Sequence, residues 1–173
     1  MKKTDAKTAD KTSRTPLLVS RCLLDTACRY DGRTSGDLRS VLEAMGFEPV
    51  SVCPESDGGL PTPRPASEVQ CERSIAILKG EGRIVNTEGA DVTAEFISGA
   101  RKALLLARET GATAAVLKSK SPSCGKGLRY DGTFSGTKTA DDGLTTALLL
   151  SEGIEVFTEH ELDDPRLAAQ LRR

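Results

Sequence analysis

The chain has 173 residues, with 24 Lys and Arg against 25 Asp and Glu, so its formal net charge is −1. This length fits one domain, and 38% hydrophobic with 28% charged residues excludes a disordered or collagen-like chain. The near-neutral charge argues against binding nucleic acid by bulk charge, and the lack of Trp argues against an aromatic stacking platform for single strands.

No apolar run approaches the roughly 18 residues that a membrane span needs. Residues 1–15 are polar and lack the apolar core of a secretory signal. We therefore predict a disordered polar tail at 1–15, an α/β domain at 16–173, and a cytoplasmic location, where thiols stay reduced. The odd count of five cysteines also fits poorly with a disulfide framework.

The first elements follow a strand–helix–strand order. Residues 16–20 form an apolar run that ends at Cys22 and predicts a buried strand. Helical spacing of apolar residues predicts a helix over 36–45. A second strand is expected over 47–53, stopped by Pro54. This order is typical of a parallel sheet.

The middle of the chain begins with a proline-rich stretch. Residues 54–65 contain four prolines and are expected to form a loop without regular helix or central strand. Residues 82–91 are expected to form a short extended pair. A long helix should then begin at Asp91 as its N-cap and end at Gly111.

The last third predicts two more strands and two more helices. A strand over 113–117 leads into a loop over 118–125. A helix over 141–151, a strand over 153–157 and a terminal helix over 159–171 follow. The fold class is therefore α/β: a single Rossmann-like domain with a mostly parallel sheet flanked by helices.

One tetrapeptide, Arg-Tyr-Asp-Gly, occurs twice, at residues 29–32 and 129–132. Two Asp-Gly turns explain the recurrence most simply. Duplicated halves are the weaker alternative.

Three cysteines fall at or just beyond the ends of predicted strands: Cys22, Cys53 and Cys124. In a parallel sheet these ends share one edge, where ligands bind. The paired spacing of a structural zinc site is missing, since the nearest pair is Cys22-x5-Cys28. An iron–sulfur cluster tolerates dispersed ligands, because each thiolate holds a separate iron. Spacing alone leaves open a metal cluster and plain buried thiols.

Acid–base candidates are few. Glu55 lies two residues after Cys53 and could carry a proton near the same strand end, although a solvated carboxylate is the simpler interpretation. His160 is the only histidine and is expected to be exposed or a capping residue. The serines around Cys124 offer hydroxyl donors at a strand end; they are Ser119, Ser121 and Ser123, interleaved with Lys118 and Lys120.

Six short strings carry a resemblance that covers nearly the whole chain after the tail. They are VSRCLL (19–24), CRYDG (28–32), VCPE (52–55), GGLPTPRP (58–65), LKSKSPSCG (117–125) and YDGTF (130–134). In this order they resemble the family called domain of unknown function 523, whose characterised members are thiouracil desulfidases.

The resemblance implies a 4Fe–4S cluster held by Cys22, Cys53 and Cys124, with the fourth iron taking the sulfur of the substrate. It also implies an acid and a serine beside the cluster. Glu55 matches the acid, and Ser121 is favoured over Ser119 for the serine. Iron would weaken the C–S bond, water would replace sulfur at carbon, and sulfide would leave without net redox change.

Three further residues stay open within the resemblance. Cys28 matches a family string and is expected to be a neighbour of the cluster or an alternative ligand. Cys71 matches no motif and is expected to be structural. Arg21 stands where the family has an alanine-like residue, and it would alter substrate choice if its charge faced the site.

The sequence therefore predicts an iron–sulfur-dependent, non-redox desulfidase acting on a thiolated pyrimidine or thionucleoside. The alternatives are a non-catalytic cluster or sulfur carrier, a binding module for thiolated RNA, and an α/β redox sensor with reduced thiols. We expect no membrane partner and no general nucleic-acid partner. The physiological substrate and the oligomeric state are left open.

Overall fold

The computed structural model describes residues 14–172. The predicted polar tail at 1–15 falls almost wholly outside these residues, and its last residue, Thr15, already belongs to the first strand. Among these residues, no helix is long and apolar enough to cross a membrane.

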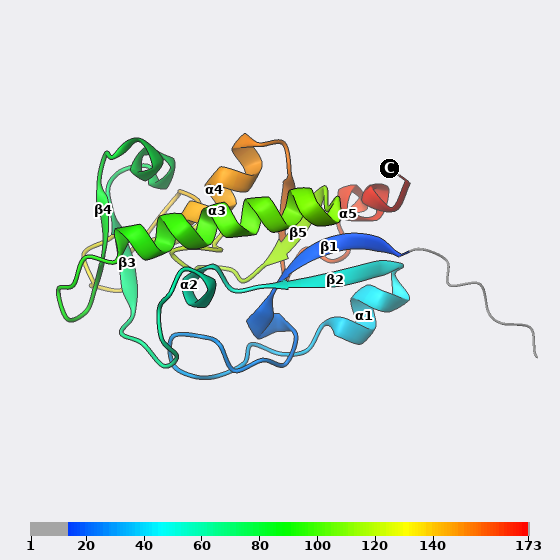
Figure 1. The fold of residues 1–173 in the computed structure, drawn as a ribbon, viewed down its shortest axis with the longest axis horizontal. Helices are drawn as coiled ribbons and strands as arrows, with labels where there is room; N and C mark the ends of the chain where they lie inside the picture. Colours follow the sequence, from blue (N-terminus) through cyan, green and yellow to red (C-terminus); the bar gives the residue numbers. More distant parts are fainter. Residues whose placement is uncertain (1–13, 173) are drawn as a thin grey trace, which may run out of the picture.

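The described residues form strands, α-helices and short 3₁₀ helices (η), and their order is shown in Figure 1. In chain order they are β1 (Thr15–Ser20), η1 (Arg21–Leu23), α1 (Arg39–Ala44), β2 (Phe47–Val52), α2 (Pro54–Asp57), β3 (Ser67–Gln70), η2 (Ser74–Lys79), β4 (Arg83–Asn86), α3 (Thr93–Thr110), β5 (Ala114–Leu117), β6 (Arg129–Tyr130), β7 (Lys138–Thr139), α4 (Leu144–Ser151), β8 (Glu155–Thr158), α5 (Pro165–Ala169) and η3 (Gln170–Arg172).

The central sheet has four strands in the order β2-β1-β5-β8, and every neighbouring pair is parallel. Its register is fixed at β1, where Leu18 lies opposite Val50 of β2 and Ala115 of β5. The strand–helix–strand order predicts this parallel sheet correctly. Because all four strands run the same way, their carboxyl ends meet at one edge (Figure 1).

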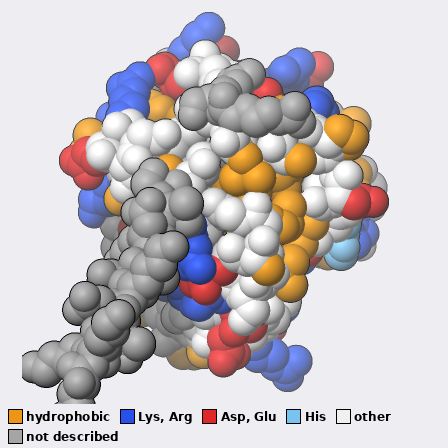
Figure 2. Space-filling view, turned by 90° about the vertical axis from the view of Figure 1, so that its right-hand side faces the viewer, with side chains coloured by type: hydrophobic (Ala, Val, Ile, Leu, Met, Phe, Trp, Pro, Cys, Tyr) orange, Lys and Arg blue, Asp and Glu red, His pale blue; other side chains and the backbone are white. Residues whose placement is uncertain are grey.

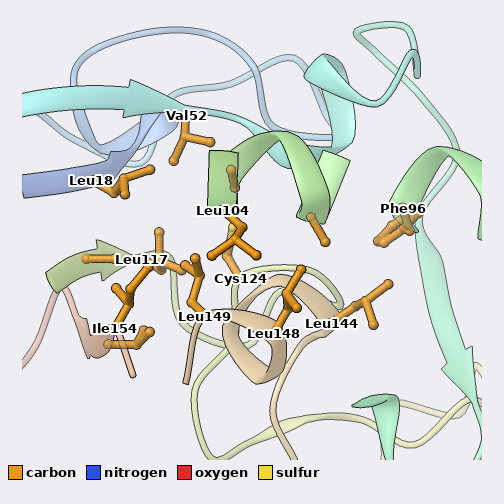
Figure 3. Close-up of a cluster of buried hydrophobic side chains, with 14 of the residues drawn as sticks. Leu18, Val52, Phe96, Leu104, Leu117, Cys124, Leu144, Leu148, Leu149 and Ile154 are labelled. Carbon is orange, nitrogen blue, oxygen red and sulfur yellow. The ribbon is translucent and has the colours of Figure 1, made fainter. Parts of the chain in front are cut away.

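Alternate residues of the two inner strands face two different cores, as the two-residue period of a strand requires. Leu18 and Ala115 pack with side chains of α3 and α4. Leu17 and Ala114 pack in a second cluster that includes residues of α1 and α5. Both faces of the inner strands are therefore covered, which explains why their sequences are continuous apolar runs. Figure 3 shows part of the first cluster, with Cys124 lying among its leucines.

Two small antiparallel pairs lie outside the central sheet. Strands β3 and β4 pair from Ser67↔Asn86 to Gln70↔Arg83. Strands β6 and β7 pair at Arg129↔Thr139 and Tyr130↔Lys138. On the face shown in Figure 2, hydrophobic side chains form a patch and charges of both signs are scattered around it. That face thus shows no one-signed surface of the kind that binds nucleic acid.

Three local predictions need correction. The stretch 54–65 contains a one-turn helix, α2, because Pro54 sits at the first helical position, where proline's missing N–H costs nothing. The predicted terminal helix over 159–171 shrinks to α5, since Asp164 caps it and Pro165 opens it. The predicted extended pair over 82–91 is only a bridge between Val85 and Asp91, and the main partner of β4 is β3.

The contact between α2 and α3 depends on two glycines. A Cβ atom at Gly99 would lie 1.8 Å from the carbonyl oxygen of Pro54, and one at Gly58 would lie 2.0 Å from that of Glu95. No side chain fits at such distances, so the two backbones touch only because both residues are glycine. This contact sets the position of α2, which directly follows Cys53.

Gly99→Ala tests the contact, because alanine ordinarily stabilises a helix interior by about 1 kcal/mol over glycine. Here we expect the opposite sign, a loss of about 1–3 kcal/mol in the free energy of unfolding, because the new methyl group overpacks the contact with Pro54. Urea unfolding measures the change. The neighbouring Ser98→Ala is the matched control and should change stability by less than about 0.5 kcal/mol. A stabilised Gly99→Ala protein would contradict the close contact.

Candidate functional site

A pocket of about 410 Å³ lies at the carboxyl edge of the central sheet. Its walls come from residues that follow β1, β2 and β5 and from β3 and β6. All six residues that the sequence singles out as site residues line it, namely Cys22, Cys53, Cys124, Glu55, Ser119 and Ser121. Cys28, Tyr30 and Tyr130 line it too, whereas Cys71 and His160 are not among its lining residues.

Cys53 is held at the junction between β2 and α2 by the Asp57 carboxylate. The Cys53 N–H donates to Asp57 Oδ2 at 3.0 Å, and Arg21 Nη2 donates to Asp57 Oδ1 at 2.9 Å. Arg21 Nε also donates to Ser51 Oγ at 3.1 Å. The charge of Arg21 is therefore paired with Asp57 and does not stand free in the pocket.

Cys124 is fixed by hydrogen bonds at both its N–H and its carbonyl. Its N–H donates to Ser121 Oγ at 3.0 Å, and its carbonyl accepts from Thr146 Oγ1 at 2.7 Å. The N-terminal amides of α4 are also engaged with this loop, since the N–H of Leu144 donates to the Pro122 carbonyl at 3.0 Å. The loop after β5 is thus tied to the start of α4.

Cys28 is a fourth thiol beside two of the predicted ligands. Its hydrogen bonds lower the pKa of Cys22 to about 7 and that of Cys53 to about 5, against the opposing effect of burial. The same contacts raise the pKa of Cys28 itself. Burial raises the pKa of Cys124. Cys22 and Cys53 are therefore predisposed to the thiolate form, which is the form that binds metals.

Glu55 lies in the first turn of α2 with its side chain only 14% exposed. Arg64 Nε donates to Glu55 Oε2 at 2.6 Å. Burial raises the pKa of Glu55, while the charge and hydrogen bond of Arg64 and the nearby Ser121 hydroxyl oppose that rise. Ser121 itself supports the Cys124 loop, because its Oγ accepts the N–H of Cys124.

Ser119 points its hydrogen bonds elsewhere. Its N–H and its hydroxyl both donate to the Glu159 carboxylate at 2.8 Å. Lys118 Nζ binds the same carboxylate and donates to Ser119 Oγ at 3.0 Å. His160 has a side chain that is 73% exposed, with Nε2 3.5 Å from Glu159, as expected for a histidine outside the site.

The two Arg-Tyr-Asp-Gly strings occupy different environments. Arg29 binds Asp31 within its own turn at 3.0 and 3.1 Å. Arg129 is fully buried and donates to Asp141 Oδ2 at 2.8 Å and to the carbonyls of Val69, Tyr130, Cys71 and Glu72. Both strings end in left-handed turns at Gly32 and Gly132, which supports two Asp-Gly turns.

Sequence reasoning gave Arg64 no role, although the structure places it against Glu55 with a side chain only 4% exposed. The available signal was a charged residue between Pro63 and Pro65, in a string that belongs to the family resemblance. Nothing in that spacing indicated its partner, because Arg64 and Glu55 are brought together by the path of the loop between them. The tyrosines of the repeated string were likewise given no place in the pocket.

Among residues 14–172, no group of three or more His, Cys, Asp or Glu side chains is arranged to hold a single metal ion. A multi-iron cluster needs a wider spacing of its ligands, because each thiolate binds its own iron and the thiols stay apart. Cys22, Cys53 and Cys124 arise from three separate strand ends around one pocket, and soft thiol sulfur is the donor that iron–sulfur clusters use.

Fold and site together define an α/β protein with a thiol-lined pocket at the carboxyl edge of a parallel sheet. Residues 17–161 match the family model described as 2-thiouracil desulfurase, and the chain belongs to this family. The resemblance found in the sequence motifs is thereby confirmed.

Two relatives match over most of their length. The chain is 42% identical over 150 residues to the uncharacterized protein YbbK of Bacillus subtilis (strain 168), covering 86% of this chain and 98% of that one. It is also 43% identical to the 4Fe-4S-dependent thiouracil desulfidase TudS, whose structure is solved. The two structures match with a TM-score of 0.79, and the match covers 91% of this chain and 99% of that one.

Glu159 gives a pH-dependent test of the pocket wall. Burial alone would raise the pKa of Glu159, but hydrogen bonds from Lys118 and Ser119 outweigh burial and lower the pKa below its usual value. A lowered pKa stabilises the fold above the unfolded value of about 4.3 and loses that effect as the pH falls through the folded value. Glu159→Gln should therefore cost about 1–3 kcal/mol at pH 7.

The difference between wild type and Glu159→Gln should shrink as the pH falls from the unfolded pKa of about 4.3 down through the lower folded pKa, where Glu159 loses its charge. Urea unfolding at a series of pH values measures it, with the exposed Glu109→Gln as the control. A constant difference at every pH would show that the ionised carboxylate is not what stabilises this wall.

Proposed function

We propose that this protein is an iron–sulfur-dependent desulfidase that removes sulfur from a thiolated pyrimidine, such as 2-thiouracil, as sulfide. One observation carries the proposal: three thiols from three strand ends and a buried carboxylate line one pocket, in a chain 43% identical to a 4Fe-4S-dependent thiouracil desulfidase. Function is argued from this site, since the α/β fold alone serves many chemistries.

Cys22, Cys53 and Cys124 are the proposed ligands of a 4Fe–4S cluster. When bound, the cluster would supply an iron without a protein ligand, a soft Lewis acid that attracts the sulfur of a thiocarbonyl group. The lowered pKa values of Cys22 and Cys53 support the assignment, because ligands must be thiolates. Cys28 is the proposed neighbour, and its hydrogen bonds to both thiols fit a role beside the ligands.

Glu55 is the proposed proton carrier. Its carboxylate lines the pocket and is oriented by the hydrogen bond from Arg64. It would take a proton from the water that replaces sulfur at carbon, in a hydrolytic reaction without net redox change. Ser121 is the proposed hydrogen-bond donor to the pyrimidine ring, because its Oγ accepts the N–H of Cys124 and keeps its own proton for a ligand. Ser119 is the second choice, because its hydroxyl already donates to Glu159.

The pocket volume suits the proposed substrate. At about 410 Å³, it falls within the range of roughly 300–1,000 Å³ typical of small-molecule sites. The five free cysteines, with Cys28 hydrogen-bonded to both Cys22 and Cys53, favour a reducing compartment, and we propose the cytoplasm.

The first test replaces each proposed ligand with alanine. Cys22→Ala, Cys53→Ala and Cys124→Ala should each lose most of the bound iron after anaerobic reconstitution, together with sulfide release from 2-thiouracil, because three thiolates anchor the cluster. Iron content, visible absorption and sulfide assays measure this. Cys71→Ala, a cysteine outside the pocket, is the control. A triple alanine variant that keeps full activity would end the proposal.

The second test separates the acid from the two serines. Glu55→Gln keeps the shape of the side chain but cannot accept a proton as a base, so kcat should fall by about 10²–10⁴ with iron content unchanged. Ser121→Ala should lower activity more than Ser119→Ala. Steady-state kinetics with 2-thiouracil measure all three. Normal turnover by Glu55→Gln would remove Glu55 from the reaction, and a larger effect of Ser119→Ala would reverse the choice of serine.

A further inference from the structure

Arg64 is the most extensively bonded side chain of the pocket. Its guanidinium donates to Glu55 Oε2 at 2.6 Å, to the carbonyl of Pro61 at 3.2 Å, to Thr62 Oγ1 at 3.2 Å and to the carbonyl of Cys28 at 3.1 Å. With 4% of the side chain exposed, this charge has given up most of its water, which is costly unless hydrogen bonds replace that water.

The four acceptors belong to three different segments. Glu55 lies in α2, Pro61 and Thr62 lie in the loop that follows it, and Cys28 lies in the loop between η1 and α1. Cys53 Sγ also contacts the Cys28 carbonyl, at 3.8 Å. One planar guanidinium therefore holds the carboxylate and a cysteine loop in a fixed relation, as its fork of donors allows and a lysine ammonium does not.

Three other cations that line the pocket are paired with different carboxylates. Arg21 pairs with Asp57, Arg29 with Asp31, and Lys118 with Glu159. Within the described residues, Arg64 is the cation that contacts Glu55. The hydrogen bond from Arg64 is thus the contact that orients the Glu55 carboxylate.

We propose that Arg64 is a positioning residue, which acts on the reaction by fixing the direction of the Glu55 carboxylate. This proposal rests on the proposed function, which assigns the proton transfer to Glu55. Without Arg64 the carboxylate loses its orienting bond, and the carbonyls of Pro61 and Cys28 lose a donor. A proton carrier displaced by a fraction of an ångström transfers protons more slowly, while the pocket still admits the substrate.

A double-mutant cycle tests the proposal. Arg64→Ala should lower kcat at least tenfold, change KM less than threefold and leave the iron content per chain unchanged. In a Glu55→Gln background the same change should alter kcat less than twofold, because a residue that acts through Glu55 has nothing left to position. Arg64→Lys, which keeps the charge but not the fork, should fall between wild type and Arg64→Ala.

The matched control is the Arg108–Glu152 pair, which lies outside the pocket and has side chains 61% and 38% exposed. Arg108→Ala and Glu152→Gln should leave kcat, KM and iron content unchanged. If Arg64→Ala and Glu55→Gln multiply independently in kcat, the proposal is overturned. Loss of iron in step with activity, with turnover per bound cluster unchanged, would also overturn it, because Arg64 would then serve the fold alone. If Arg64→Ala does not fold, the cycle is run with Arg64→Lys.

Failure of the proposed function is a separate outcome. A wild-type protein that holds iron but releases no sulfide from 2-thiouracil would refute the proposed activity on that substrate. The same cycle is then read in the unfolding midpoint of the iron-loaded proteins. If Arg64→Ala shifts this midpoint equally in the wild-type and Glu55→Gln backgrounds, the two side chains do not act as a unit and the positioning proposal is overturned as well.

Discussion

The parallel pairing of β1 with β2 and β5 determines where the pocket forms. Parallel strands all end at the same edge of the sheet, so segments distant in the chain begin their loops side by side there. Cys22, Cys53 and Cys124 each follow one of these strands. Their convergence therefore needs no local motif, because the strand order of the sheet alone places the three thiols around one pocket.

The edge of the sheet carries many charges, and several of them lie in pairs. Buried Arg64 contacts Glu55, and half-buried Lys118 contacts Glu159. Within residues 14–172, no buried side-chain nitrogen or oxygen lacks a hydrogen-bond partner. This matters because an unpaired buried charge is far more costly than an unpaired surface one. The pairs stabilise the fold only modestly, but they determine which way each polar side chain points into the pocket.

Close packing transmits this order from the core to the pocket. Helix α3 is anchored in the main hydrophobic cluster through Phe96 and Ala100, and its Gly99 touches the backbone of α2. Since α2 begins directly after Cys53 and carries Glu55, the position of the acid is tied to the hydrophobic core. Cys124 is itself a member of that cluster. The edge of the sheet that carries the pocket is thus packed directly against the main hydrophobic cluster.

What the sequence could predict follows from the range of the interactions involved. Apolar runs identified β1, β2, β5 and β8, because buried parallel strands have a strong local signal. Strand β3 escaped notice because its sequence, Ser67–Gln70, is mostly polar and it pairs outside the central sheet. The predicted terminal helix is too long because apolar spacing does not reveal that the helix begins only at Pro165, after a turn. Arg64 was missed because its partner depends on the course of a loop.

The two serines show how far a motif reaches and where geometry takes over. Ser119 and Ser121 are two residues apart in one polar string, and residue type does not distinguish them. Ser119 gives both its N–H and its hydroxyl to Glu159, so it closes the wall toward β8. Ser121 Oγ accepts the N–H of Cys124, so it supports the loop that carries a proposed ligand. The two hydroxyls therefore have different hydrogen-bond partners, and these partners cannot be read from a single sequence.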